Sequence, residues 1–152
     1  MEPALNWFDA YDHCKSQGGK LVEIDSEEEN TALIEEIKRK GYTERKMNFW
    51  IGLTDLGSEG DWRLASSGLK PSYVNWHDGE PNNAYNNEDC AWIRIGTYKD
   101  WKGTWADINC EQQYFTMREY ITTNTDKYTS YTYSMQGQDK PGASHLQRSE
   151  PS

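Results

Sequence analysis

Residues 54–89 constrain the fold of this chain more than any other part of its sequence. They lie between two apolar stretches, FWIGL at 49–53 and Ala91–Ile95, that are typical of buried strands. A polar loop of this length inside a compact domain is usually either functional or disordered. Its turn-forming residues are Gly57, Gly60, Gly68, Gly79, Pro71 and Pro81. Embedded aromatic residues indicate that the loop is packed: Trp62, Tyr73 and Trp76.

Helical periodicity predicts two helices before this loop. Over residues 7–17, one face carries Trp7, Ala10, Tyr11 and Cys14. Asn6 is the expected N-cap of this helix, and the glycines at 18–19 end it. A capping box of Ser26 and Glu29 begins the second helix, which ends near residue 41. Its buried stripe consists of Leu33, Ile34 and Ile37.

The remaining elements are predicted to be strands, which makes the fold class α+β. Residues 21–24 and 114–117 each contain an apolar run, at Leu21, Val22 and Ile24 and at Tyr114, Phe115 and Met117. After Tyr120 the sequence is dominated by Ser, Thr, Tyr, Gln and Lys, which bury too little apolar surface to fold alone. We therefore predict one domain over residues 1–120 and a disordered tail over residues 121–152.

Charge excludes several classes of partner. The chain carries 16 basic and 25 acidic residues, a formal net charge of -9. Nucleic acids and anionic lipid surfaces both select a basic face, so neither is expected to bind. No apolar run approaches the roughly 18 residues that span a bilayer. The first residues, MEPALNW, also lack the apolar stretch of a secretory signal.

Acidic residues are concentrated in and around the long loop. Between residues 54 and 89 only Arg63 and Lys70 offset them. Many carboxylates on one surface repel one another unless a cation neutralises them. Because the ligands would all be oxygen atoms on flexible loops, calcium fits better than magnesium or zinc. The acids are Asp55, Glu59, Asp61, Asp78, Glu80, Glu88, Asp89 and Asp107.

The same acids do not form a pattern that predicts an enzyme. Glycoside hydrolysis needs one carboxylic acid whose pKa is raised by an apolar pocket. Here the acids lie among asparagines and other acids, with no isolated member. The sequence has no serine nucleophile motif and no phosphate-binding glycine loop.

Several short motifs occur together in a characteristic order. They are the first helix with Cys14, GGKLVEI at 18–24, WIGL at 50–53, EPN at 80–82, EDC at 88–90 and WAD at 105–107, followed by Cys110. The ordered set resembles the C-type lectin-like domain family over about residues 6–120. The resemblance implies two helices packed on a mixed, mainly antiparallel sheet, with a long calcium-binding loop region. It also implies a Cys90–Cys110 disulfide, a cis peptide bond before Pro81 and a secreted, extracellular protein.

The resemblance assigns two calcium sites. The principal site would use Glu80, Asn82, Glu88 and Asp107, and the same four residues would also bind the hydroxyls of a sugar. The auxiliary site would use Asp55, Glu59, Asn83 and Asp89. EPN, rather than QPD, implies sugars with equatorial 3- and 4-hydroxyls: mannose, glucose, GlcNAc or fucose.

The sequence departs from the family pattern in three places. Ala106 stands where the family has an asparagine that contacts both the ion and the sugar, which predicts weak sugar binding. The last family cysteine is absent, with Arg118 or Met117 in its place. Cys14 is therefore expected to be unpaired, as an inert buried thiol or as an intermolecular bridge. Only MEPALN precedes Trp7, where the family has a first strand, so we expect a domain incomplete at both ends.

We therefore predict a calcium-dependent, mannose-type carbohydrate-binding protein of innate immune recognition or adhesion. The alternative is an interaction protein on the same fold that binds a protein or a mineral surface, with calcium as a scaffold only. The acidic balance and Ala106 favour the alternative, whereas the intact EPN motif favours sugar.

Overall fold

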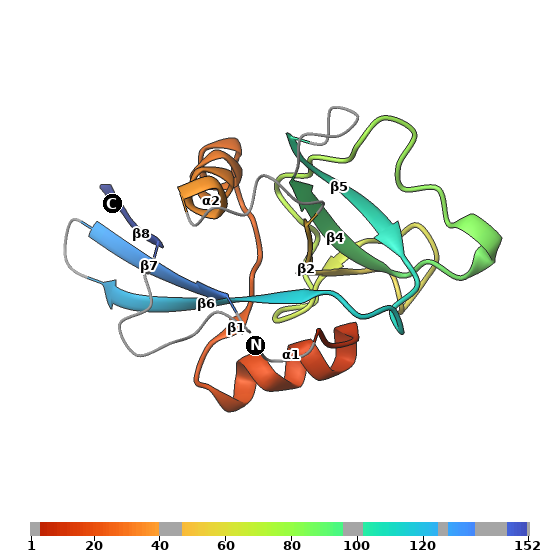
Figure 1. The fold of residues 1–152 in the computed structure, drawn as a ribbon, viewed down its shortest axis with the longest axis horizontal. Coiled ribbons are helices and arrows are strands. Elements are labelled where there is room, and N and C mark those ends of the chain that lie inside the picture. The colour runs from red at the N-terminus through yellow and green to blue at the C-terminus, as the bar shows by residue number, and fades with distance from the viewer. Residues whose placement is uncertain (1–3, 40–46, 96–101, 125–127, 136–145, 152) are drawn as a thin grey trace.

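The computed structural model describes residues 4–39, 47–95, 102–124, 128–135 and 146–151. Within these ranges, two α-helices accompany a mixed eight-stranded sheet. Figure 1 shows the two helices on opposite sides of the long strand β6 (Phe115–Asn124). The predicted α+β class, with two helices on a mixed sheet, is confirmed.

Local sequence signals account for both helices. Helix α1 (Trp7–Ser16) begins at Asn6, whose Oδ1 accepts a hydrogen bond from the Asp9 amide at 2.8 Å. Helix α2 (Glu27–Arg39) begins after Ser26, whose hydroxyl accepts a hydrogen bond from the Glu29 amide at 3.1 Å. The Glu29 carboxylate reaches back to the Asp25 amide, also at 3.1 Å. The end of α2 that we expected near residue 41 lies outside the described residues.

The sheet has the order β5-β4-β2-β6-β7-β8, with β1 paired to β6 and β3 paired to β2. Strands β2 and β6 run parallel, and the other named pairs are antiparallel. The strand expected over residues 21–24 is shorter, because only Lys20–Leu21 pairs as β1. The other strands are β2 (Met47–Thr54), β3 (Arg63–Leu64), β4 (Cys90–Ile95), β5 (Lys102–Ile108), β7 (Tyr128–Met135) and β8 (Leu146–Pro151).

Strands occur in the described parts of residues 121–152, the segment that we expected to be a disordered tail. Strand β6 continues to Asn124, β7 pairs with it, and β8 pairs with β7, all antiparallel. Threonine and tyrosine, which are frequent in β7, favour strands. The proposed boundary at residue 120 falls within β6, and the division into two units stays a prediction.

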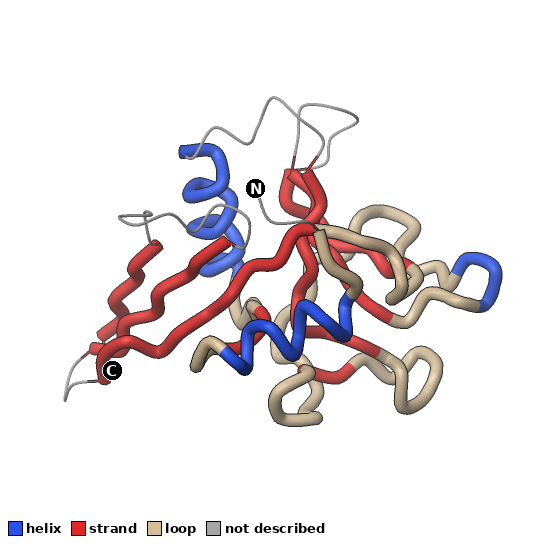
Figure 2. The backbone as a smooth tube through the Cα atoms, turned by 60° about the horizontal axis from the view of Figure 1, so that its bottom comes forward, coloured by secondary structure: helices blue, strands red, loops and turns tan. Residues whose placement is uncertain are grey.

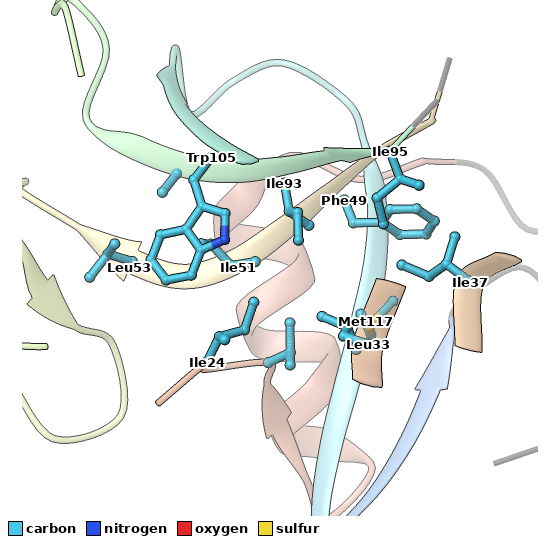
Figure 3. Close-up of a cluster of buried hydrophobic side chains, with 12 residues drawn as sticks. Ile24, Leu33, Ile37, Phe49, Ile51, Leu53, Ile93, Ile95, Trp105 and Met117 are labelled. Atoms are coloured by element: carbon cyan, nitrogen blue, oxygen red, sulfur yellow. The ribbon is translucent and has the colours of Figure 1, made fainter. Parts of the chain in front are cut away.

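Two apolar clusters form the core. In the main core, side chains of β2 and β4 face Leu33 and Ile37 of α2 (Figure 3). The second core lies against α1 and contains Trp7, Cys14 and Trp50. It also contains Cys90 and Cys110, which form the disulfide that the resemblance implied.

The segment before α1 is tied to the rest of the domain. Leu5 and Tyr114 form an antiparallel bridge, with N–H···O distances of 3.0 and 2.9 Å. The indole nitrogen of Trp50 donates to the Leu5 carbonyl at 2.8 Å. Where the family pattern has a first strand, the described residues provide one bridge. Neither helix in the described ranges has the length and apolar character needed to cross a lipid bilayer.

The long loop is packed, as its aromatic residues predicted. The rings of Trp62 and Trp76 have centres 4.9 Å apart, and Trp76 and Tyr73 each meet Trp105 edge-on. The indole of Trp105 donates to Asn30 of α2 at 3.0 Å. A chain of aromatic contacts thus connects the loop to β5 and α2 and gives the loop a fixed position.

Candidate functional site

Strand register brings distant acidic residues to one end of the sheet. Thr54, at the end of β2, pairs with Cys90 at the start of β4, and Ala91 pairs with Asp107 on β5. Asp55 and Asp89 therefore leave the sheet side by side, and the Asp55 amide donates to the Asp89 carbonyl at 3.1 Å. The long loop returns to the same end of the sheet at Glu80.

Asp107 joins this loop to β5. Its side chain is only 3% exposed. One carboxylate oxygen accepts a hydrogen bond from the Asn82 amide at 2.9 Å, and the other accepts from the Asn83 amide at 2.7 Å. The Glu80–Pro81 peptide bond immediately before them is cis, as the resemblance implied.

The four residues predicted for the principal site, here called the EPN cluster, are connected with one another. The Asn82 side-chain amide donates to Glu80 at 3.1 Å. The backbone amide of Ala84 donates both to the Asn82 side-chain oxygen at 3.1 Å and to Glu88 at 2.9 Å. Together with the two bonds to Asp107, these contacts place Glu80, Asn82, Glu88 and Asp107 around one turn of the loop.

Burial and like charge make the EPN cluster unfavourable when its acids are ionised. Burial, a hydrogen bond to Asp107 and the charges of Asp107 and Glu88 raise the pKa of Glu80 to about 8. Burial, together with the charge of Asp107, also raises the pKa of Glu88. The Oε2 atom of Glu80 is buried and accepts no hydrogen bond from the described residues. A buried acceptor in that position is costly unless it has a partner.

Three of the four residues predicted for the auxiliary site form a second group, here called the acidic triad. Asp55, Glu59 and Asp89 each offer a carboxylate oxygen, and these oxygens lie within 4.8 Å of one another. Burial is the largest cause of the raised pKa of Asp55 and of Asp89. One Asp55 oxygen accepts from the Gly60 amide at 2.8 Å, while Oδ1 is buried with no hydrogen-bond partner among the described residues.

Asn83, the fourth residue predicted for the auxiliary site, bonds to residues of the EPN cluster. Its side-chain oxygen accepts a hydrogen bond from the Glu88 amide at 3.0 Å, and its own amide donates to Asp107. Asn83 therefore links the turn of the EPN cluster, and its part in the auxiliary site stays a prediction. The charge of Asp107 contributes to the raised pKa of Asp89, so the two groups interact electrostatically.

Both groups have the chemistry that a hard cation requires. Their side chains offer oxygen atoms, and each contains one buried oxygen without a partner, at Glu80 and at Asp55. A divalent ion would relieve the repulsion that raises these pKa values. Carboxylate and amide oxygens carried on loops fit calcium.

Ala106 contributes nothing polar to this end of the sheet. It is 2% exposed, pairs with Trp92, and packs in the second core. Its neighbours Trp105 and Asp107 are buried as well, in the main core and in the EPN cluster respectively. The methyl group of Ala106 has no atom that can bind an ion or a sugar hydroxyl. Ala106 therefore cannot replace the asparagine of the family pattern.

Sequence reasoning missed several residues that position the acids. The Thr54 hydroxyl donates to the Asp89 carbonyl at 2.7 Å. The His77 carbonyl accepts from the Glu80 amide at 2.8 Å, and its ring bonds to the Thr104 hydroxyl, also at 2.8 Å. These contacts depend on strand register and left no sequence signal. Gly60, named among the turn-forming residues of the loop, donates its amide to Asp55.

Comparisons with known proteins agree on one family. The sequence model of the Lectin C-type domain matches residues 3–117. A perlucin-like protein from Mytilus galloprovincialis is 42% identical over 107 residues, which are 69% of this chain. The match spans 63% of that relative's own length.

Solved structures show the same relationship. The cow carbohydrate-recognition domain of CD23, determined in the presence of a GlcNAc2Man3 oligosaccharide, is 31% identical with a TM-score of 0.60. That similarity covers 74% of this chain and 76% of the CD23 chain. The lectin CEL-I from Cucumaria echinata is 26% identical with a TM-score of 0.65, covering 76% of this chain and 83% of CEL-I. The chain therefore belongs to the C-type lectin domain family.

Proposed function

We propose that this chain binds saccharides through calcium held by the EPN cluster, with a preference for mannose-type sugars. The observation that carries the proposal is one buried carboxylate oxygen in each group, Glu80 Oε2 in the EPN cluster and Asp55 Oδ1 in the acidic triad, that accepts no hydrogen bond from the described residues. The pKa values of both residues are raised. Membership of the C-type lectin domain family supports a saccharide as the ligand. The CD23 domain solved with an oligosaccharide provides further support.

The residues of the EPN cluster and Asn83 have distinct parts in this proposal. Glu80, Asn82, Glu88 and Asp107 would hold the ion, while the hydrogen bonds from Asn82 and Asn83 to Asp107 keep the loop in place. When bound, calcium supplies positive charge and coordination positions that sugar hydroxyls can complete. The carboxylates of Glu80 and Glu88 can accept hydrogen bonds from sugar hydroxyls, and the Asn82 amide can donate one.

The acidic triad would hold a second ion that stabilises the loop. Asp55, Glu59 and Asp89 supply its carboxylate oxygens. Asn83, which the sequence assigned to this site, bonds to Glu88 and would act by connecting the two groups. An ion at the triad would therefore support the EPN cluster through the Asp55–Asp89 backbone contact and through Asn83.

We propose a binding protein rather than an enzyme. A raised carboxyl pKa is also a property of general acids. In Glu80, however, the causes that raise the pKa after burial are the neighbouring carboxylates of Asp107 and Glu88, which a cation would neutralise. Asn82 beside it is exposed and cannot act as a base. The Cys90–Cys110 disulfide and the family support an extracellular location, and a role in innate recognition or adhesion would use the same site.

Ala106 and the net charge of -9 favour a second candidate function. In that case calcium is a scaffold only, and the acidic surface binds a protein or a mineral. Both candidate functions require bound calcium. They differ in whether a sugar binds to it.

Affinity chromatography separates the two candidates. The protein is loaded in calcium onto mannose-, GlcNAc- and galactose-agarose and eluted with EDTA. We expect retention on mannose and GlcNAc, release by the chelator, and loss of retention in Glu80→Gln. Glu28→Gln, which changes an exposed acid of α2, is the matched control and should be retained. No retention on any sugar, together with a calcium-induced change in tryptophan fluorescence, would favour the scaffold.

A further inference from the structure

Helix α2 is joined to the strand that carries Asp107, although it lies away from the turn of the EPN cluster. Figures 1 and 2 show α2 and the short 3-10 turn η1 (Ala84–Asn86), which belongs to that turn, on opposite sides of β4 and β5. Helix α2 and β5 meet at Gly103, where an added Cβ atom would overlap the side chain of Ile34. Gly103 also has a positive φ, at 83°. Only glycine satisfies both conditions, so the start of β5 packs closely against α2.

One buried polar side chain of α2 bonds to β5 twice. Asn30 is 4% exposed. Its Nδ2 donates to the Gly103 carbonyl at 3.1 Å, and its Oδ1 accepts from the Trp105 indole at 3.0 Å. A buried polar group that loses its partner is costly, so these two bonds hold β5 in one position against α2. Asp107 lies two residues beyond Trp105 on the same strand.

The Gly103 carbonyl is also a partner of the loop segment that leads to the EPN cluster. The Nδ2 atom of Asn75 donates to it at 2.9 Å. The Asn75 carbonyl accepts from the Trp105 amide at 2.8 Å, and the His77 amide donates to the Trp105 carbonyl at 2.7 Å. The His77 carbonyl in turn accepts from the Glu80 amide at 2.8 Å. A continuous chain of hydrogen bonds therefore runs from α2 to the first residue of the EPN cluster.

We propose that Asn30 is a positioning residue for calcium at the EPN cluster, which acts through the Gly103 carbonyl and Trp105 without contacting the ion. This inference rests on the proposed function. Glu80 comes from the loop and Asp107 from β5, so the ion must be held from both. Its affinity then depends on how the loop and β5 are placed relative to each other, because groups behind the ligands orient them.

The acidic triad provides an internal reference for this proposal. Asp55 follows β2 and Asp89 precedes β4, and their backbones bond directly to each other at 3.1 Å. The chain of hydrogen bonds from Asn30 does not pass through either residue. A change at Asn30 should therefore affect calcium at the EPN cluster and leave calcium at the triad unaffected.

Three alanine variants of the full chain separate positioning from folding. Asn30→Ala removes both bonds from α2, and Asn75→Ala removes the other donor to the Gly103 carbonyl. Leu33→Ala is the control, because it truncates a fully buried apolar residue of the same helix that has no part in the polar chain. Calcium is titrated by calorimetry into each protein after EDTA treatment, at a temperature where its melting curve shows that it is folded. Glu80→Gln identifies the calcium-binding event of the EPN cluster, since it alters a proposed ligand.

We expect Asn30→Ala and Asn75→Ala each to weaken that event by roughly three- to tenfold, the effect of one net hydrogen bond. Together they should weaken it by less than the product of the two single effects, because both act on one carbonyl. Calcium binding that survives in Glu80→Gln should be unchanged by Asn30→Ala. Leu33→Ala should lower the melting temperature and keep the calcium affinity of the unmodified chain.

Calcium affinity in Asn30→Ala equal to that of the unmodified chain, or an equal loss in Leu33→Ala, would show that Asn30 only stabilises the fold. The proposed function would then stand without this role for Asn30. If Asn30→Ala does not fold, Asn75→Ala decides by the same criteria, because it breaks the same chain of hydrogen bonds at the half-buried end. If Glu80→Gln leaves calcium binding by the unmodified chain undiminished, the proposed function is wrong, and the role of Asn30 is wrong with it.

Discussion

The carboxylate of Asp107 accepts hydrogen bonds from two loop amides, while its charge helps to raise the pKa of Glu80. One side chain therefore both builds the EPN cluster and makes it unfavourable without a counter-charge. The structure resolves this conflict only in part, since Glu80 Oε2 is buried without a partner among the described residues. The residues of the cluster are arranged for a ligand that supplies positive charge.

The raised pKa of Glu80 predicts how the metal-free protein responds to pH. Its ordinary value of 4.5 rises to about 8 in the folded protein. Between these values the folded state keeps a proton that the unfolded chain has lost, so stability falls as pH rises from 4.5 to 8. The raised pKa values of Asp55, Glu88 and Asp89 act in the same direction.

Thermal melts in EDTA across this pH range measure the effect. We expect the melting temperature to fall as pH rises, and to fall less steeply in Glu80→Gln, which cannot ionise. Calcium should reverse the trend, because it binds the deprotonated acids. An identical slope in Glu80→Gln and the unmodified protein would show that Glu80 does not keep its proton in this window.

Ala106 sets the expected strength of sugar binding. Replacing it with asparagine adds an amide next to Asp107 in the chain, at a position that packs in the second core. If that amide bonds to the ion or to the sugar, affinity for mannose should rise about two- to tenfold, the effect of one net hydrogen bond. Titration of mannan or methyl mannoside measures the change.

The matched control for this change is Ala106→Leu, which has a similar size and no polar group. Because Ala106 is buried beside Trp92, both variants need a melting curve to show that the second core tolerates the larger side chain. Our interpretation of Ala106 is contradicted if the asparagine variant is folded and binds mannose no better than the unmodified chain.

Sequence reasoning found the acidic residues more reliably than their contacts. Glu80, Asn82, Glu88 and Asp107 were identifiable because their motifs have a recognisable order. Asn83 was assigned to the auxiliary site, which stays a prediction, and its side-chain oxygen also accepts a hydrogen bond from the Glu88 amide. Thr54 and His77 could not be predicted, because their contacts depend on which strands become neighbours.

At the scale of elements, the long loop is held by aromatic packing together with short stretches of backbone pairing. Trp76 lies between Trp62 and Trp105, and the adjoining backbone of Asn75 and His77 bonds to both sides of Trp105. These contacts fix the segment that leads directly into Glu80. The geometry of the EPN cluster therefore depends on a ring that offers no ligand atom.

This dependence predicts the effect of Trp76→Ala. Truncating a fully buried large aromatic residue costs about 3–5 kcal/mol, so we expect about 2–4 kcal/mol for this half-buried ring. Calcium affinity should fall as well, because the loop before Glu80 loses its support. Denaturant unfolding in EDTA and a calcium titration by fluorescence measure the two effects.

Val74→Ala provides the control for this prediction, since it truncates an exposed side chain of the same loop. It should change neither stability nor calcium affinity appreciably. If Trp76→Ala weakens folding but leaves calcium affinity unchanged, the aromatic contacts support the domain without positioning the site.

The helices and the central strands follow from the sequence because several local signals agree. Asn6 caps α1, Ser26 and Glu29 cap α2, and the apolar runs coincide with β2 and β4. The disordered tail predicted over residues 121–152 rested on low apolar content and stays a prediction. Strand β7 pairs with β6, and β8 pairs with β7, and such pairing is not visible in local composition.

At the scale of the whole molecule, two cores hold one end of the sheet rigid and leave the acids at that end. The main core fixes β2, β4 and β5 against α2, and the second core joins α1 to the Cys90–Cys110 disulfide. The chain also carries a net charge of -9. A rigid frame with concentrated negative charge is suited to bind a cation without a large rearrangement.

The central claim is that sugar binding requires calcium at the EPN cluster. The most direct measurement is a calorimetric titration of methyl mannoside into the protein, first in calcium and then in EDTA. We predict saturable binding in calcium, none in EDTA, and none for Glu80→Gln in calcium. Equal binding with and without calcium, or undiminished binding by Glu80→Gln, would contradict the account.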